Sequence, residues 1–500
     1  MRNLDTPVKQ IRRKIFTEIA KIGFESTDES MIHDIESIPY NIVEERAKYR
    51  ESIYRERAVA SERVRLAMGL SLRPENRSVH LTDGVKASNI DEKYYEPPLM
   101  QVIPSACSAC ESNKYEVSNM CRGCVAHPCM LTCPKGAISM VNGHSYIDQE
   151  KCVHCGKCKS VCPYDAISKK ERPCSRACGV KAIGSDEFGR AKIDNEKCVS
   201  CGMCMVSCPF GAISDKSQIY QLARSLKEGN EIIAEIAPAF VGQFGSMEPK
   251  DVHAALETLG FSEVYEVALG ADIGAVSEAR HYAEKVATGE LPFLLTSCCP
   301  SWSMLAKKYF PTMIDNISQE LTPMVATARS IKQEHPDAKV VFIGPCAAKK
   351  LEASRRSVRS DVDFVITFEE LVGMFDAKGI DMGEKENAHS MHDATAAGRG
   401  YAVAGGVAGA IEECLKAYYP DVTPKIIHAE GLAECKKTLA LAKAGKMNGC
   451  LIEGMGCPGG CIAGAGTNIP IPTAKKDVAA YVKNSSRALP PKELEEIELK

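Results

Sequence analysis

Three short apolar runs in the second half of the chain have the pattern of buried β-strands. They read EIIAEIAPAF from Glu231, KVVFIGPC from Lys339 and GCLIEGMGC from Gly449. Segments with helical patterning, such as 251–260 and 275–287, lie between such runs. This alternation predicts an α/β fold with a mostly parallel sheet, a class in which strand ends commonly supply the functional site.

The first 100 residues contain no cysteine and read as helical. Residues 41–68 are rich in Glu, Arg and Ala, and their apolar positions share one helical face, which indicates a packing helix or a partner surface. Pro97 and Pro98 mark the end of this part. We expect four parts: a helical N-terminal extension (1–100), a cysteine-rich domain (101–215), an α/β domain (216–475) and a charged C-terminal tail (476–500).

Composition narrows the class of protein. With 62 basic and 65 acidic residues, the net charge of -3 favours neither nucleic acid nor an anionic membrane as a partner. The N-terminus has no apolar signal core, and no run of about 20 apolar residues is present to cross a membrane. The 24 cysteines therefore indicate metal ligation in a reduced, cytoplasmic setting rather than disulfides.

Two cysteine runs have the spacing of bacterial ferredoxins. Cys152-x2-Cys155-x2-Cys158-x3-Cys162-Pro163 is repeated as Cys198-x2-Cys201-x2-Cys204-x3-Cys208-Pro209. In such a run the first three cysteines hold one 4Fe-4S cluster and the fourth reaches the neighbouring cluster. This internal repeat predicts a ferredoxin-like α+β domain that carries electrons.

The remaining cysteines of this domain complete four sets of four. Cys133 and Cys178 stand in similar phrases before the two runs, so each is expected to supply the fourth ligand of a run's first three cysteines. The predicted 4Fe-4S sets are Cys133 with Cys152, Cys155 and Cys158; Cys178 with Cys198, Cys201 and Cys204; Cys121, Cys124, Cys129 and Cys162; and Cys107, Cys110, Cys174 and Cys208.

Two alternatives remain open at this stage. The two CxxC pairs, Cys107/Cys110 and Cys121/Cys124, are interchangeable between the last two sets. They also have the spacing of a four-thiolate zinc site, which would leave Cys129, Cys162, Cys174 and Cys208 without a clear role.

Five more cysteines lie in three glycine-rich segments of the α/β part. These are TSCCPSW with Cys298 and Cys299, GPCAAKKLE with Cys346, and EGMGCPGGCIAGAG with Cys457 and Cys461. Soft thiolates suit iron, and glycine lets the backbone approach an inorganic cluster. The three segments resemble the active-site motifs of the iron-only (FeFe) hydrogenases, and the resemblance covers roughly residues 230 to 475.

The resemblance implies an H-cluster, a 4Fe-4S cubane joined to a di-iron unit with CO, cyanide and a bridging dithiolate. Cys299, Cys346, Cys457 and Cys461 would hold the cubane, with Cys461 bridging to the di-iron unit. Cys298 matches the family's proton-donating thiol, and a thiol can exchange protons near neutral pH.

The resemblance also assigns residues around the di-iron unit and along a proton path. Lys349 would donate to a cyanide ligand, whereas its neighbour Lys350 is expected to be solvated. Glu278 and Ser318 match the proton path, whose outer part would fall near His281 and Lys285. The other expected cofactor contacts are Met455, Pro345, Gly459 and Gly460, and the expected buried cysteines without a ligand role are Cys414, Cys435 and Cys450.

We therefore expect an FeFe-hydrogenase that interconverts H2 with protons and electrons. Its expected partners are ferredoxin or a similar soluble carrier and the hydrogenase maturation proteins. Gly344, where the best-studied members usually carry methionine, and Ala465 indicate a divergent branch. The alternative is an H2-sensing or iron–sulfur assembly protein on the same scaffold. Assembly relatives generally lose the thiol that Cys298 retains, and no signalling domain is recognisable.

Overall fold

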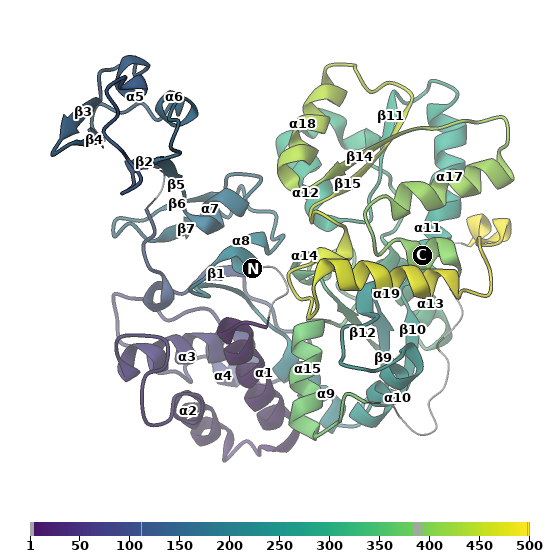
Figure 1. The fold of residues 1–500 in the computed structure, drawn as a ribbon. Coiled ribbons are helices and arrows are strands. Elements are labelled where there is room, and N and C mark those ends of the chain that lie inside the picture. Colours follow the sequence, from purple (N-terminus) through teal and green to yellow (C-terminus); the bar gives the residue numbers. More distant parts are fainter. Residues whose placement is uncertain (1–4, 112, 384–390, 392–393, 498, 500) are drawn as a thin grey trace.

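The structure is a computed structural model that describes residues 5–111, 113–383, 391, 394–497 and 499. Two parallel sheets form the α/β half (Figure 1). Strands of the larger sheet lie in the order β10-β9-β12-β13, and those of the smaller in the order β11-β15-β14. Their bounds are β9 Ile232–Ile236, β10 Glu263–Glu266, β11 Phe293–Leu295, β12 Lys339–Gly344, β13 Phe364–Thr367, β14 Lys425–Glu430 and β15 Cys450–Met455.

Helices cover both sheets, which confirms the predicted α/β class. α10 and α15 pack on the larger sheet, and α12, α17 and α18 pack on the smaller. The expected helices 251–260 and 275–287 correspond to α10 and to α11 with the π-helical turn that follows it. The helices are α9 Ile219–Lys227, α10 Pro249–Leu259, α11 Ala268–His281, α12 Pro300–Tyr309, α13 Pro323–Glu334, α14 Ala347–Glu352, α15 Phe368–Lys378, α16 Ala396–Gly400, α17 Gly406–Tyr418, α18 Leu432–Lys443 and α19 Ile471–Lys483.

The N-terminal helices form a layer of the α/β half rather than a separate bundle. They are α1 Pro7–Glu25, α2 Met31–Ile42, α3 Ile53–Ala67 and α4 Val85–Ser88. α1 packs along α15 and α9, and its apolar residues share one core with the larger sheet. A Cβ at Gly373 of α15 would lie 2.6 Å from the Cβ of Phe16, so glycine is needed for this close approach.

A buried ion-pair network ties this layer to the rest of the chain. Arg12 lies 3.0 Å from Glu369 and 3.5 Å from Asp215, and Lys350 lies 2.7 Å from Asp215 and 2.8 Å from Glu370. Lys350 is only 2 % exposed. The prediction that Lys350 is solvated is therefore wrong: the carboxylates of Asp215 and Glu370 compensate its burial, which sequence position alone does not reveal.

The cysteine-rich segment forms short hairpins and single-turn helices along one side of the molecule (Figure 1). Its outermost portion, residues 113–170, is called the distal arm below. The elements are β1 Met100–Val102, β2 Lys114–Val117, β3 Ile138–Val141, β4 His144–Ile147, β5 Ile167–Lys170, β6 Ile183–Ser185, β7 Ala191–Ile193 and β8 Ile213–Asp215, with α5 Pro128–Leu131, α6 Lys157–Ser160, α7 Pro173–Ala177 and α8 Met203–Ser207.

The two ferredoxin-type runs adopt the same backbone. His154 and Ser200 occupy equivalent positions and both have φ of 53°, and each is followed two residues later by a left-handed glycine, Gly156 or Gly202. These turns direct the cysteines of each run toward one point, as a cluster requires. No helix in the described part of the chain is long and apolar enough to span a membrane.

Candidate iron–sulfur and catalytic centres

Cysteines follow three of the parallel strands. Cys299 is the N-cap of α12 and follows β11, and Cys346 is the N-cap of α14 and follows β12. Thiolates are favoured at helix N-termini, where backbone N–H groups and the helix dipole stabilise negative charge. Cys457 and Cys461 lie in the loop after β15. The α/β architecture thus brings together segments that are far apart in the sequence.

The loop that carries Cys457 and Cys461 depends on glycine. Gly459 and Gly460 have φ of 98° and 85°, values that other residues rarely adopt. A Cβ at Gly460 would lie 2.4 Å from the backbone nitrogen of Ala404, and one at Gly464 would lie 2.4 Å from the carbonyl oxygen of Pro345. The segment of Cys461 is therefore pressed against the backbone beside Cys346.

The four cysteines of this centre lie close enough for their charges to interact. Burial raises the pKa of Cys346 to about 11 and that of Cys461 to about 12, and the neighbouring Cys299 raises both further. Burial, Cys346 and Cys299 hold the pKa of Cys457 well above its ordinary value. Thiols gathered in this way ionise readily only when a cation is bound among them. The donor set and its glycine loop fit an iron–sulfur cubane.

Cys298 and Glu278 lie near each other beside this centre. Burial raises the pKa of Glu278 to about 7, although hydrogen bonds from Ser318 and Ser297 lower it in part. The pKa of Cys298 is raised well above its usual range by burial, and Cys299 and Glu278 add to the effect. The structure therefore brings the predicted proton-path residues Cys298, Glu278 and Ser318 together.

Two buried hydroxyls in this region make no hydrogen bond within the described part of the chain. They belong to Thr296 and Tyr401, which are 0 % and 7 % exposed. Burial raises the pKa of Tyr401, and the charges of Glu278 and Cys298 raise it as well, so the Tyr401 ring lies near both residues. Buried hydroxyls are rarely left unpaired, and a polar group that the polypeptide does not supply would satisfy them. Sequence analysis missed Tyr401 because its surroundings, GRGYAVAGG, carry no metal-ligand spacing.

Lys349 is buried and oriented by two partners. Its Nζ lies 2.7 Å from a carboxylate oxygen of Glu352 and 3.1 Å from the hydroxyl of Thr322. Burial alone would lower the pKa of Lys349, but the ion pair with Glu352 raises it. The ammonium group is therefore kept charged beside Cys346 and Cys298. Met455 ends β15 and is 3 % exposed.

Lys285, near which the outer proton path was expected, is engaged on the surface. Lys285 is paired with Glu290 at 2.6 Å on the surface. Behind Ser318 lies instead Glu320, whose backbone N–H donates to the Ser318 hydroxyl at 3.3 Å and whose charge acts on Glu278. Glu320 is half-buried. Sequence analysis did not single out Glu320, because only the fold places it beside Glu278.

The other sixteen cysteines fall into the four sets expected from their spacing. Cys133, Cys152 and Cys158 share one small core, with Cys155 beside Cys158. Three small cavities are each lined by four cysteines: Cys121, Cys124, Cys129 and Cys162; Cys107, Cys110, Cys174 and Cys208; and Cys178, Cys198, Cys201 and Cys204. Among the described residues, no three His, Cys, Asp or Glu side chains converge tightly enough to hold a single metal ion.

Cysteine sulfurs in these sets accept hydrogen bonds from backbone N–H groups in a repeated pattern. The N–H groups of Ala137, Ala182 and Ala212 point to Cys133, Cys178 and Cys208, each four residues earlier, at 3.2–3.3 Å. Such hydrogen bonds stabilise cluster thiolates. Cys414, Cys435 and Cys450 are buried outside every set, as predicted.

One set adjoins the catalytic centre. Cys201 raises the pKa of Cys457, and Cys346 raises that of Cys201, so these thiols are neighbours. A Cβ at Gly202 would lie 2.6 Å from the Cβ of Ala465, which shows how closely the two loops pack. The cysteine-rich segment therefore reaches the centre directly.

The comparisons with known proteins agree with this geometry. Residues 230–465 match the model of the iron-only hydrogenase large subunit, C-terminal domain, and residues 145–168 and 191–214 match the 4Fe-4S binding domain. The chain is 28% identical over 377 residues to the periplasmic Fe hydrogenase large subunit of Nitratidesulfovibrio vulgaris, covering 64% of this chain and 85% of that subunit.

Other relatives are matched over shorter lengths. Iron hydrogenase 1 of Clostridium pasteurianum is 27% identical over 275 residues, 47% of this chain and about half (48%) of its own length. The cytosolic Fe-S cluster assembly factor NAR1 of Meyerozyma guilliermondii is 28% identical over 156 residues, 29% of each chain. A solved structure of FeFe-hydrogenase HydA1 from Chlamydomonas reinhardtii matches with a TM-score of 0.42 and 23% identity over 53% of this chain and 87% of that chain. By their motifs and their family match, residues 230–465 belong to the iron-only hydrogenase family, as a divergent member that follows two 4Fe-4S binding segments.

Proposed function

We propose that this chain is an iron-only hydrogenase, which splits H2 into two protons and two electrons and catalyses the reverse reaction. One observation carries the proposal: Cys298 lies beside the buried side chains of Glu278 and Ser318 and beside four gathered cysteines. A protein that only held a cubane would have no use for a proton relay there. The family match and the unpaired Tyr401 hydroxyl support the same reading.

The residues that would hold the H-cluster are Cys299, Cys346, Cys457 and Cys461, with Cys461 shared with the di-iron unit. The bound group would supply the iron site at which H2 is cleaved heterolytically. Lys349 would fix an anionic cyanide by a charge-assisted hydrogen bond, because its ammonium group is buried and kept charged. The other residues expected to surround the H-cluster are Pro345, Met455, Gly459 and Gly460. The maturation proteins would deliver the di-iron unit.

The proton would leave through this chain's own side chains. Cys298 would receive it first, and Glu278 would accept it next, since its pKa of about 7 matches a relay at neutral pH. Ser318 would pass it toward Glu320, which is half-buried and adjoins the Ser318 hydroxyl. This outlet would replace the route past His281 and Lys285.

The electrons would leave one at a time through four 4Fe-4S clusters. The set with Cys201 adjoins the catalytic centre, and the set with Cys155, an exposed cysteine, lies in the distal arm. We expect about 22 iron atoms per chain, counted as five cubanes and one di-iron unit. A count near 16 cubane irons with one zinc ion would favour the zinc site instead. The separate cavities of Cys107/Cys110 and Cys121/Cys124 support four clusters.

The surface of the distal arm suits an acidic electron carrier such as ferredoxin. Val125 and Leu131 are 96 % and 84 % exposed there, although they are large and apolar. Residues 118–170 carry seven basic and three acidic side chains. Exposed apolar residues within a basic surface are typical of a docking site for an acidic partner. Ferredoxin is a cytoplasmic carrier, and we place the protein in the cytoplasm.

Exchange of hydrogen isotopes between H2 and water tests the proposal, because it needs the catalytic centre but no external electron carrier. Matured, anaerobic protein should catalyse it, and Cys298→Ala should lose most of the rate. Cys414→Ala is the matched control, since Cys414 is also buried but lies outside the sets. If the fully matured parent catalyses neither exchange nor dye-linked H2 turnover, the assembly or sensing role is correct, as the match to NAR1 would then indicate.

A further inference from the structure

A cavity of about 800 Å³ lies between the N-terminal layer and the loop that carries Cys208. α1, α3 and the segment 42–51 form one side of it, and residues 205–211 form the other. Its volume is within the range of small-molecule binding sites, roughly 300–1,000 Å³. The hydrogenase reaction as proposed above uses none of the residues from the N-terminal side.

The cavity is strongly basic. Within the described part of the chain, five of its basic side chains form no ion pair: Lys9, Arg46, Lys48, Arg50 and Arg63. Its acidic residues are already engaged. Glu369 pairs with Arg12 at 3.0 Å, Glu51 pairs with Arg55, and Glu56 accepts the backbone N–H groups of residues 48–50.

Arg63 is the residue that most strongly indicates an anionic ligand in this cavity. It is 6 % exposed, its terminal nitrogen donates to the Gly211 carbonyl, and its Nε has no hydrogen-bond partner among the residues that the structure describes. Burial lowers the pKa of Arg63 to about 10, with Arg12 acting in the same direction and with Glu369 and Cys208 opposing it only in part. A buried guanidinium that has no ion pair of its own is costly unless an anion balances it.

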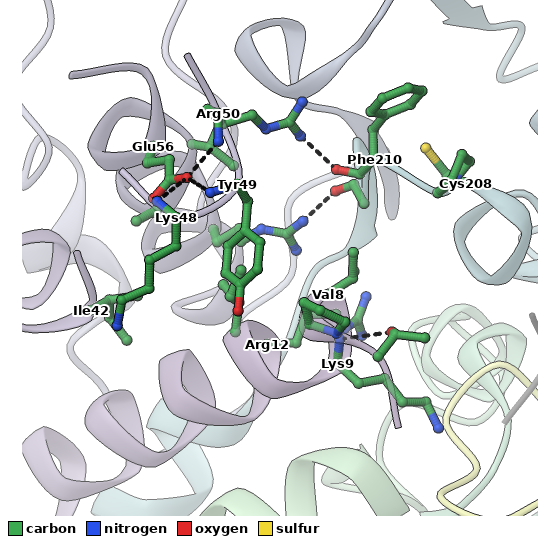
Figure 2. A pocket seen from close by; sticks show the side chains of 18 of the residues that line it. Val8, Lys9, Arg12, Ile42, Lys48, Tyr49, Arg50, Glu56, Cys208 and Phe210 are labelled. Carbon is green, nitrogen blue, oxygen red and sulfur yellow. Dashed lines mark hydrogen bonds between the residues drawn. The ribbon is translucent and has the colours of Figure 1, made fainter. Parts of the chain in front are cut away.

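Arg50 and its neighbours are held in place at the cavity. Figure 2 shows Arg50 reaching toward the carbonyl of Phe210, to which it donates at 2.8 Å, with Lys9 and Arg12 of α1 nearby. The Arg50 guanidinium also stacks 5.7 Å from the centre of the Phe210 ring. Glu56 fixes the backbone of Lys48, Tyr49 and Arg50, so these side chains are held at the cavity.

We propose that this cavity binds a phosphate-bearing organic anion of about nucleotide size, with Arg63 and its basic neighbours on the phosphate groups. Arginine favours phosphate because its planar donors match two oxygens at once. Val8, Ile42, Val59 and Ile213 line the cavity and would cover the apolar part of the ligand.

The site also adjoins the electron path. Cys208 lines this cavity and the small cavity shared with Cys107, Cys110 and Cys174. A bound anion would therefore lower the reduction potential of a cluster held there, since added negative charge disfavours uptake of an electron. This second consequence rests on the proposed relay, whereas binding itself does not.

Calorimetric titration of the anaerobic, cluster-loaded protein with ADP and with pyrophosphate tests the site. ADP should bind, and Arg63→Gln should weaken it about 10- to 100-fold. Arg77→Gln, an exposed arginine outside the cavity, should bind like the parent. Because Arg63→Gln can impair folding, Lys48→Glu at the exposed mouth provides a second test and should also weaken binding.

Absence of ADP and pyrophosphate binding to the parent protein would overturn the proposal. So would equal affinities for the parent and Lys48→Glu. A redox titration followed by electron paramagnetic resonance should show one cluster signal moving to lower potential with ADP present. If ADP bound without shifting the potential, the binding site would stand, but its effect on the cluster of Cys208 would be disproved. ADP binding does not depend on hydrogenase activity, so a protein without that activity should still bind ADP.

Discussion

The distal arm and the α/β half both gather cysteines in sets of four, but they surround them differently. In the arm, one small core of six buried residues includes Cys129 and Cys158 themselves. In the α/β half, two of the four cysteines cap helices and the other two lie in a loop after β15, and the surrounding cores are built from aliphatic and aromatic side chains. The arm is therefore expected to depend on its clusters for its fold, whereas the α/β half provides a scaffold that exists before its cofactor arrives.

In the proposed function, the two regions also divide electron flow from proton flow. Cys155 of the arm is exposed, as electron exchange with a carrier requires. Around Cys298, burial holds thiol and carboxyl pKa values above their ordinary range. A proton relay needs such a shielded place, because groups with pKa values near the working pH transfer protons best.

Removal of the clusters is expected to have the largest effect, and it acts on the two regions unequally. After chelation and oxidative cluster loss, residues 113–170 should lose protection in hydrogen exchange, because ligand binding and folding are coupled there. Strands β9, β12 and β15 should stay protected. Equal loss in both regions, measured peptide by peptide, would show that the α/β half depends on its cofactor as much as the arm does.

The second prediction concerns the shielded thiol. Cys298→Ala should lower H2 turnover by about 10²–10⁴-fold, the usual contribution of a positioned proton donor, with iron content unchanged. Cys298→Asp should retain part of the activity, because a carboxyl group also relays protons. H2 turnover is measured with a dye as electron acceptor. If the alanine variant turned over H2 at the rate of the parent, Cys298 would be only a packing residue.

The third prediction concerns the pH dependence of stability. Glu278 has a pKa of about 7 when folded, against an ordinary value of 4.5, so the unfolded chain ionises first as the pH rises. The free energy of unfolding therefore falls as the pH rises between these two pKa values, by about 3 kcal/mol in total at pH 8. Glu278→Gln should raise the thermal midpoint at pH 8 and leave it unchanged near pH 4. An equal effect at both pH values would mean that the carboxyl group is not buried in its neutral form.

The fourth and smallest effect is expected at the tip of the arm. Cys155→Ser should slow electron exchange with ferredoxin several-fold and spare isotope exchange between H2 and water, which needs no external electrons. Both rates are measured on the same preparation, and iron analysis confirms the remaining clusters. If both rates fell together, the arm would be required for the catalytic centre itself rather than for the electron path.

Much of the fold follows from local pattern. The strands β9, β12 and β15 appear as apolar runs, and β12 and β15 are followed by the expected Cys346 and Cys457, because sites in parallel sheets form at the carboxyl ends of the strands. The four cysteine sets follow from spacing, since a repeated run imposes the same turns at His154 and Ser200. These features are encoded within short segments and need no knowledge of long-range packing.

The features that sequence analysis missed depend on contacts between distant segments. Lys350 is buried because Asp215 and Glu370 lie beside it, and those residues are 135 and 20 positions away. Glu320 and Tyr401 join the surroundings of Glu278 only through the packing of the α/β half. No spacing rule links such residues, so a single sequence does not reveal them.

The infrared spectrum of matured, anaerobic protein tests the central claim most directly. A di-iron unit held by Cys461 and contacted by Lys349 would carry CO and cyanide, whose stretching bands lie in a region free of protein absorption. We expect such bands, expect them to change under H2, and expect the cyanide bands to shift in Lys349→Met, which removes the donor. A protein with its cubanes fully loaded but without any CO or cyanide band after maturation would contradict the assignment of this site as a hydrogenase centre.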